Sequence, residues 1–111
     1  MYTIKKTTIT LTRGDTLKAQ ISITDPDGNP YVMQEGDVVR FAAKKHYTDP
    51  DEEVQILKEI PSDTLILTLE PEDTKDLDFG EYVYDIQLIT AAGEVDTFIT
   101  KSTLIISEEV Y

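Results

Sequence analysis

Apolar and polar residues alternate one by one along several stretches of this chain. From Asp15 to Thr24 the apolar residues fall on every second position, and polar residues lie between them. The apolar positions of this stretch are Leu17, Ala19, Ile21 and Ile23. A period of two is the pattern of a strand with one buried face. The same alternation recurs after Gly36-Asp37 and from Leu65 to Leu69, so both segments are also predicted to be half-buried strands.

Four further segments have strand character. Residues 3–11 are rich in β-branched side chains and are predicted to form one strand. The short segment 54–58 is predicted to be an edge strand, and 81–90 and 95–106 a hairpin across the turn 91–94. The apolar phase slips between Phe98 and Ile105, which indicates a bulge. Pro71 followed by acidic residues indicates one helical turn over 71–77.

The segment from Leu77 to Ile86 resembles the corner that leads into a strand of an immunoglobulin-like sandwich. Gly80 stands at the corner, and Tyr82 and Tyr84 follow on one face of the strand. Tyr82 is therefore predicted to be the corner tyrosine, whose hydroxyl donates to the backbone of the 71–78 crossover.

These elements predict an all-β fold, an immunoglobulin-like antiparallel β-sandwich of about seven strands with one short helical turn. Residues 1–111 are predicted to form a single domain. The chain has no tryptophan and no cysteine, so the two core markers of antibody domains are missing. The predicted core contains Leu17, Ile21, Ile23, Phe41, Leu65, Leu67, Tyr82, Tyr84 and Ile86.

Composition excludes several classes of function. Without cysteine there are no disulfides, thiolate metal sites or thiol nucleophiles. No apolar run is long enough to span a membrane, and the first residues lack the apolar core of a signal peptide. A cytoplasmic protein is therefore expected. The net charge of −12 would repel nucleic acid and anionic membrane, so neither is an expected partner.

Two acidic segments are candidates for cation binding. Asp25 to Asn29 resembles the opening of a calcium loop, but the sixth and twelfth positions hold Pro30 and Gly36 in place of glycine and glutamate. We interpret this segment as a turn. The second cluster, Asp73, Asp76 and Asp78, is suited either to hold a hard cation or to charge the helical turn. We expect no metal and no cofactor.

Two further motifs are interpreted structurally. Arg13-Gly14-Asp15 matches an adhesion tripeptide, but its position between two strands favours a turn. His46 is the only histidine, lies in a polar loop and has no serine nucleophile elbow to serve. It is predicted to be a surface residue. No catalytic residues are therefore assigned, and the protein is not expected to be an enzyme.

The turns and corners of this chain together resemble one known family. The segments that carry the likeness are 11–16, 27–31, 36–41, 69–74, 80–86 and 93–97. They are similar to the immunoglobulin-like domains of phage and prophage baseplate upper proteins and related tail-associated modules. The resemblance implies a virion component that functions by assembly.

The sequence therefore predicts a non-enzymatic structural module of a phage or prophage tail or baseplate, which binds other subunits or itself. A β-sandwich carbohydrate-binding module is the alternative, and it needs two or three exposed aromatic residues on one face. Val54, Ile56 and Leu57 mark the first candidate for a docking edge, and segment 3–11 is the second.

Overall fold

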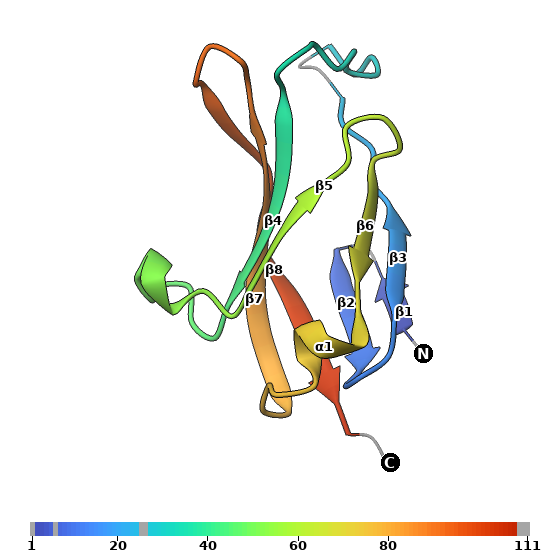
Figure 1. Ribbon diagram of the computed structural model, residues 1–111, viewed down its shortest axis with the longest axis vertical. Helices are drawn as coiled ribbons and strands as arrows, with labels where there is room; N and C mark the ends of the chain where they lie inside the picture. Colours follow the sequence, from blue (N-terminus) through green and yellow to red (C-terminus); the bar gives the residue numbers. More distant parts are fainter. Residues whose placement is uncertain (1, 6, 25–26, 109–111) are drawn as a thin grey trace.

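The computed structural model describes residues 2–5, 7–24 and 27–108, and it is an all-β structure (Figure 1). The strands are β1 (Tyr2–Lys5), β2 (Thr8–Thr12), β3 (Leu17–Gln20), β4 (Val38–Lys44), β5 (Ile56–Ile60), β6 (Ile66–Leu69), β7 (Gly80–Ile89) and β8 (Val95–Ser107). A 3₁₀ turn, η1 (Asp51–Glu53), precedes β5, and a single helical turn, α1 (Pro71–Thr74), follows β6. The predicted helical turn is confirmed.

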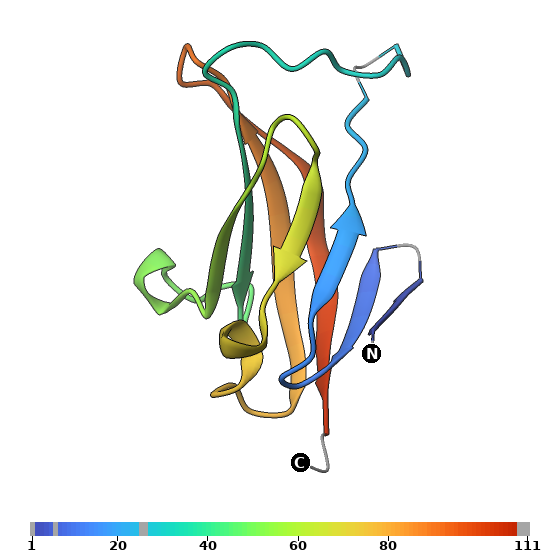
Figure 2. The ribbon, with the colours of Figure 1, turned by 45° about the vertical axis from the view of Figure 1, so that its right-hand side comes forward.

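The strands form two sheets that face each other (Figure 2). The larger sheet has six strands in the order β1-β2-β8-β7-β4-β5, and the smaller one pairs β3 with β6. Side chains alternate between the buried and outer faces, as in β4, where Val39, Phe41 and Ala43 are buried. Burial of apolar surface between the sheets is the main force that holds them together.

The core confirms most of the predicted positions. Leu17, Ile23, Phe41, Leu67, Tyr82, Tyr84 and Ile86 are buried. Ile21 and Leu65 are only partly buried and pack at the edge of the core. Leu65 adopts a left-handed φ of 53° and donates its amide to the carbonyl of Pro61 at 2.8 Å. It therefore closes a turn, and β6 begins one residue later.

The N-terminal strand prediction was wrong in two ways. Segment 3–11 is not one strand, because β1 ends at Lys5 and pairs antiparallel with β2, with Tyr2 opposite Leu11. Strand β2 in turn pairs parallel with β8, with Ile9 opposite Leu104. The fold is therefore not wholly antiparallel, and the described residues form eight strands. No glycine, proline or asparagine marks the break, so strand propensity alone made the segment look continuous.

The predicted bulge in β8 is confirmed. Tyr84 lies opposite Ser102, Ile86 opposite Ile99 and Gln87 opposite Thr97, so β8 has two extra residues over this stretch. Lys101 in the bulge has a φ of 44° and donates its amide to Asp85 Oδ1 at 3.0 Å. The aspartate thus occupies a donor that the regular ladder leaves without a partner.

The glycine corner positions the two tyrosines as the sequence indicates. Gly80 has a φ of 130°, which favours glycine, and Tyr82 follows on the buried face. The Tyr82 hydroxyl donates to the Asp78 carbonyl at 2.8 Å, which is the predicted bond to the crossover. The Tyr84 hydroxyl donates to the Thr7 carbonyl, and its ring centroid lies 5.1 Å from that of Phe41. Burial raises the pKa of both phenols.

Candidate functional site

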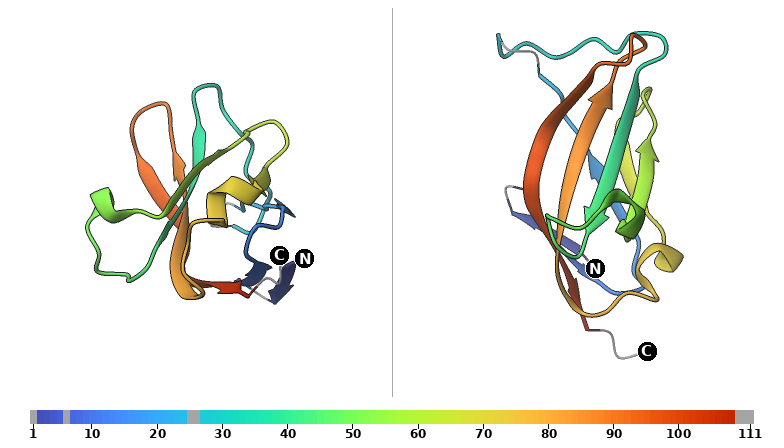
Figure 3. Two further views of the ribbon diagram at one scale, coloured as in Figure 1. Left: turned by 60° about the horizontal axis from the view of Figure 1, so that its bottom comes forward. Right: turned by 90° about the vertical axis from the view of Figure 1, so that its left-hand side faces the viewer.

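A hollow lies on the outer face of the six-stranded sheet. It has a volume of about 350 Å³ and is open to solvent on one side. Residues of strands β4, β5 and β7 form its floor, and residues of the loop between β4 and β5 line its side. Figure 3 shows the course of this loop next to the strands. We call this hollow the outer groove. Its main lining residues are Arg40, Ala42, Lys44, Tyr47, Asp51, Val54, Leu57, Val83, Asp85 and Gln87.

The floor of the outer groove follows from the strand register. Arg40 lies opposite Gln87 on β7, and Ala42 lies between Leu57 on β5 and Asp85 on β7. Residues directly opposite each other in a sheet share a face, so polar and apolar side chains form adjacent rows across the strands. The floor is therefore mixed in character.

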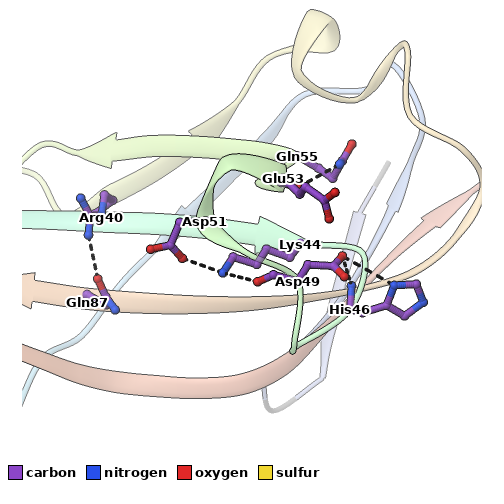
Figure 4. Close-up of polar contacts among 8 residues, drawn as sticks. All are labelled: Arg40, Lys44, His46, Asp49, Asp51, Glu53, Gln55 and Gln87. Carbon is purple, nitrogen blue, oxygen red and sulfur yellow. Dashed lines mark hydrogen bonds and ion pairs between the residues drawn. The ribbon is translucent and has the colours of Figure 1, made fainter.

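The cations of the outer groove are paired within it (Figure 4). Lys44 Nζ donates to Asp51 Oδ1 at 2.7 Å and to the Asp49 carbonyl at 3.0 Å. Arg40 Nη2 donates to Gln87 Oε1 at 3.0 Å. The hydrogen bond from Lys44 lowers the pKa of Asp51, and the same bond raises the pKa of Lys44. Both groups are therefore charged at neutral pH and hold the loop against β4.

The loop itself is a hydrogen-bonded turn. Asp49 Oδ2 accepts the His46 amide at 3.0 Å, and the Asp49 amide donates to the His46 carbonyl at 3.1 Å. His46 is exposed, as predicted, and its Nδ1 lies 3.6 Å from Asp49 Oδ2. Tyr47 follows at the rim of the groove, where 55% of it is exposed and Lys101 Nζ lies 4.3 Å from its ring centroid. The turn thus presents an aromatic face beside the groove.

The three residues of the first candidate docking edge do not lie on one surface. Leu57 is 56% exposed, and with Val54 it lines the outer groove. Ile56 is buried in the core, so its side chain is not part of this exposed surface. The strand also begins at Ile56 and not at Val54, because Val54 still closes the 3₁₀ turn with a bond to the Asp51 carbonyl.

The free edge of β5 carries a charge that points inward. Lys58 lies opposite Phe41 on the buried face, and its Nζ reaches Asp73 Oδ2 at 3.0 Å. An inward-pointing lysine on an edge strand opposes the addition of a further strand. The exposed part of this region is therefore the face that carries Leu57 and not the backbone edge of β5.

The second acidic cluster does not converge. Asp73 pairs with Lys58 and accepts the Glu70 amide at 2.7 Å, whereas Asp78 Oδ2 lies 3.5 Å from Lys45 Nζ. Within the described ranges 2–5, 7–24 and 27–108, no group of three histidine, cysteine, aspartate or glutamate side chains is arranged to hold a metal ion. Asp25 and Pro26 of the calcium-like segment lie outside the described residues.

The Arg13-Gly14-Asp15 tripeptide is a structural turn. Arg13 Nη1 donates to the Leu77 carbonyl at 3.0 Å, and its guanidinium lies 4.1 Å from the centroid of the Phe79 ring. The Gly14 amide donates to Thr74 Oγ1 at 2.9 Å. The tripeptide is thus hydrogen-bonded to and packed against the crossover that contains α1.

The alternation after Gly36-Asp37 implies that Arg40, Ala42 and Lys44 share one face of a strand, but it does not indicate a site on that face. The missing information was the return of the loop over the strands, which depends on Lys44 reaching Asp49 and Asp51. The signal available in the sequence was the pair of long cationic side chains, Arg40 and Lys44, on the polar face of β4 with the small Ala42 between them.

Comparison with known proteins adds no family assignment. No protein-family model matches this sequence, and a search of curated proteins gives no significant match. Among the residues that the structure describes, no helix is long and apolar enough to cross a membrane.

Proposed function

We propose that this chain is a non-enzymatic interaction module that docks on protein subunits through its outer groove. The observation that carries the proposal is that both cationic side chains of the groove are hydrogen-bonded to other groove residues, beside exposed apolar surface. Lys44 and Arg40 are occupied by Asp51 and Gln87, whereas Leu57 and Tyr47 are more than half exposed. Such a surface suits shape-complementary contact with a partner, in which aromatic and aliphatic anchors contribute most of the affinity.

We further propose that the two sheets form an immunoglobulin-like sandwich. In that fold the second and fifth core strands share one sheet, and the third, sixth and seventh share the other. The pairing of β3 with β6, and the neighbouring β4, β7 and β8, support this assignment. The bond from Tyr82 to the Asp78 carbonyl supports it independently, because a corner tyrosine is a mark of such sandwiches.

The proposed setting is the tail or baseplate of a phage or prophage. It rests on the resemblance of the turn and corner segments to baseplate modules, and would make the protein a virion component. The proposed mode of action is assembly by contact, without covalent chemistry, metal or cofactor.

A carbohydrate-binding module is the second candidate, favoured by Tyr47 at the rim of a groove that also holds Arg40, Asp85 and Gln87. Aromatic faces stack on sugars, and fixed polar groups orient them. The other exposed aromatic among the described residues, Phe79, stacks with Arg13 near the crossover instead of lining the groove. The groove therefore supplies one aromatic where this candidate needs two or three.

The test is co-purification of the full chain with the product of each neighbouring gene, alongside a glycan array. Leu57→Asn should abolish capture of the partner, and Val32→Asn should not, because Val32 is 73% exposed but does not line the groove. A defined glycan whose binding is lost in Tyr47→Ala, with no subunit co-purified, would replace this proposal with the carbohydrate-binding module.

A further inference from the structure

A second hollow opens between the two sheets beside β3. It has a volume of about 140 Å³, and its apolar lining includes Ile9, Ala19, Ile21, Leu67, Ile86 and Ile99. None of its lining residues is charged, although 29% of the chain is. We call it the lateral slot. Its lining residues are of the kind that fill a protein core, but the slot is open to solvent on one side.

Two strands border the lateral slot, and each has an edge there that is not paired with another described strand. Strand β3 pairs only with β6 among the described strands. Ile21, just after β3, donates its amide to the Leu65 carbonyl at 2.8 Å. In an antiparallel pair the backbone N–H and C=O groups of successive residues point alternately toward and away from the partner strand. The N–H and C=O groups of Gln20 therefore point away from β6.

The upper half of β8 has a similar open side. Strand β2 pairs with β8 only from Leu104 to Ser107, so in the described part of the chain no strand flanks residues 95–103 on that side. Figure 2 shows the β1–β2 hairpin beside the lower half of β8 only. The slot therefore has the geometry of a sandwich that lacks one strand.

The N-terminal segment of the chain has the chemistry that this position requires. The first 14 residues contain three of the ten basic residues and none of the 22 acidic ones. A strand from this segment is therefore attracted to the acidic remainder of a second copy. In β1 the apolar Tyr2 and Ile4 alternate with Thr3 and Lys5 in the sequence, the pattern of a strand with one apolar face. Strand β1 is also the terminal strand of its sheet.

We propose that β1 of a second copy adds to the free edge of β3 and closes the lateral slot. The added strand turns the two-stranded sheet into a three-stranded one and covers the apolar lining. Each copy carries both β1 and β3, so the contact forms twice in a two-fold dimer. This inference rests on the proposed function in one respect, that the module works by assembly, and it assigns self-association to a surface other than the outer groove.

The experiment compares Gln20→Pro with Gln20→Ala in the full chain by analytical ultracentrifugation over a range of protein concentration. Proline removes the amide that faces the added strand and leaves the bonds to β6 intact. Alanine is the matched control because the Gln20 side chain also donates to the Thr64 carbonyl at 2.9 Å. We expect wild type and Gln20→Ala to dimerise alike, and Gln20→Pro to dimerise about tenfold more weakly. Equal dimerisation of two variants with the same melting temperature would overturn the proposal, as would a monomeric wild type.

A second pair of variants tests β1 as the added strand, and it tests the proposal even if Gln20→Pro does not fold. Lys5→Glu and Lys75→Glu change the net charge equally, but only Lys5 lies in β1. Lys5→Glu should weaken dimerisation, and Lys75→Glu should leave it near the wild-type value. Equal effects would overturn the role of β1. Capture of a subunit through Leu57 is measured separately, so loss of the slot interaction and loss of groove docking give different results.

Discussion

Asp37, Thr74 and Ser102 are the buried polar residues among those described, and each connects parts of the chain that are distant in sequence. Thr74 Oγ1 accepts the Gly14 amide, and Ser102 bonds with Tyr84. Asp37 accepts the Tyr31 hydroxyl at 2.7 Å, the Gln34 amide at 2.9 Å and the Ala91 amide. No buried side-chain nitrogen or oxygen in the described residues lacks a hydrogen bond, so these groups add specificity without an unpaired polar atom.

Leu67 tests the apolar core. It is 1% exposed on the inner face of β6, so Leu67→Ala should lower the free energy of unfolding by about 2–5 kcal/mol. Urea denaturation measures this value. Leu57→Ala removes the same atoms from an exposed position and should cost less than about 0.5 kcal/mol. Similar losses for the two variants would contradict the assignment of Leu67 to the core.

Tyr82 tests the glycine corner. Tyr82→Phe keeps the ring but leaves the Asp78 carbonyl without its donor, which should cost about 1 kcal/mol and lower the melting temperature. Tyr47→Phe is the control, because Tyr47 lies exposed at the groove rim. An unchanged melting temperature for Tyr82→Phe would mean that the hydroxyl does not hold the corner.

Asp37 tests a carboxylate whose pKa is lowered, first by the Gln34 amide and then by the Tyr31 hydroxyl. Because the folded pKa lies below the unfolded value, the stability from Asp37 is present above the unfolded pKa. It is lost as the pH falls through the folded pKa. Asp37→Ala should therefore destabilise the protein at pH 7 and differ less from wild type in acid. Unfolding midpoints at a series of pH values, with exposed Asp63→Ala as control, check this. A constant difference down to low pH would show that the charge is irrelevant.

At the scale of elements, the loop before β4 packs against the β7–β8 hairpin. Gly36 has a φ of 90°, and a β-carbon there would lie 2.8 Å from the Ala91 β-carbon. Gly93 in the hairpin turn has a similar φ of 88° but nothing within 4 Å of its β-carbon position. The two glycines therefore separate the cost of backbone conformation from the cost of a steric clash.

Gly93→Ala should destabilise the protein by about 1–2 kcal/mol through backbone strain alone. Gly36→Ala should cost a further 1–3 kcal/mol or so, because overpacking adds to the strain. Ala91→Gly in the Gly36→Ala background should recover the clash component and leave the strain. Chemical denaturation of wild type, Gly36→Ala, Ala91→Gly and the double variant closes this cycle, and Gly93→Ala is measured beside it. If Gly36→Ala and Gly93→Ala are equally destabilising, the loop does not press on the hairpin.

Local patterns predicted the elements well where one face is buried. The alternation in β4 predicted a strand with one buried face, which Val39, Phe41 and Ala43 form, and the phase slip located the bulge in β8. The parallel pairing of β2 with β8 was not predictable in this way, because it depends on closure of the whole sheet. The outer groove was not predictable for a related reason. It forms only when the loop that contains Asp51 folds back and Asp51 contacts Lys44.

At the scale of the molecule, charge and shape act on different distances. The net charge of −12 makes two copies repel each other over distances up to about the Debye length. The pairing of β1 with the lateral slot stabilises the dimer only once the two copies are in contact. The basic N-terminal segment gives one local attraction within this overall repulsion. Self-association of the chain is therefore a balance that ionic strength shifts.

The prediction at this scale is that self-association strengthens as salt rises from about 0.01 M to about 0.15 M, where the Debye length falls from about 30 Å to about 8 Å. Screening weakens the repulsion between two copies of charge −12 more than it weakens the contact of β1 with its partner. Light scattering over protein concentration at each ionic strength measures the dissociation constant. Sodium and potassium chloride should act equally, since the effect is one of screening and not of a bound ion. A dissociation constant that rises with salt would show that the local attraction of β1 dominates, and that the net charge does not limit assembly.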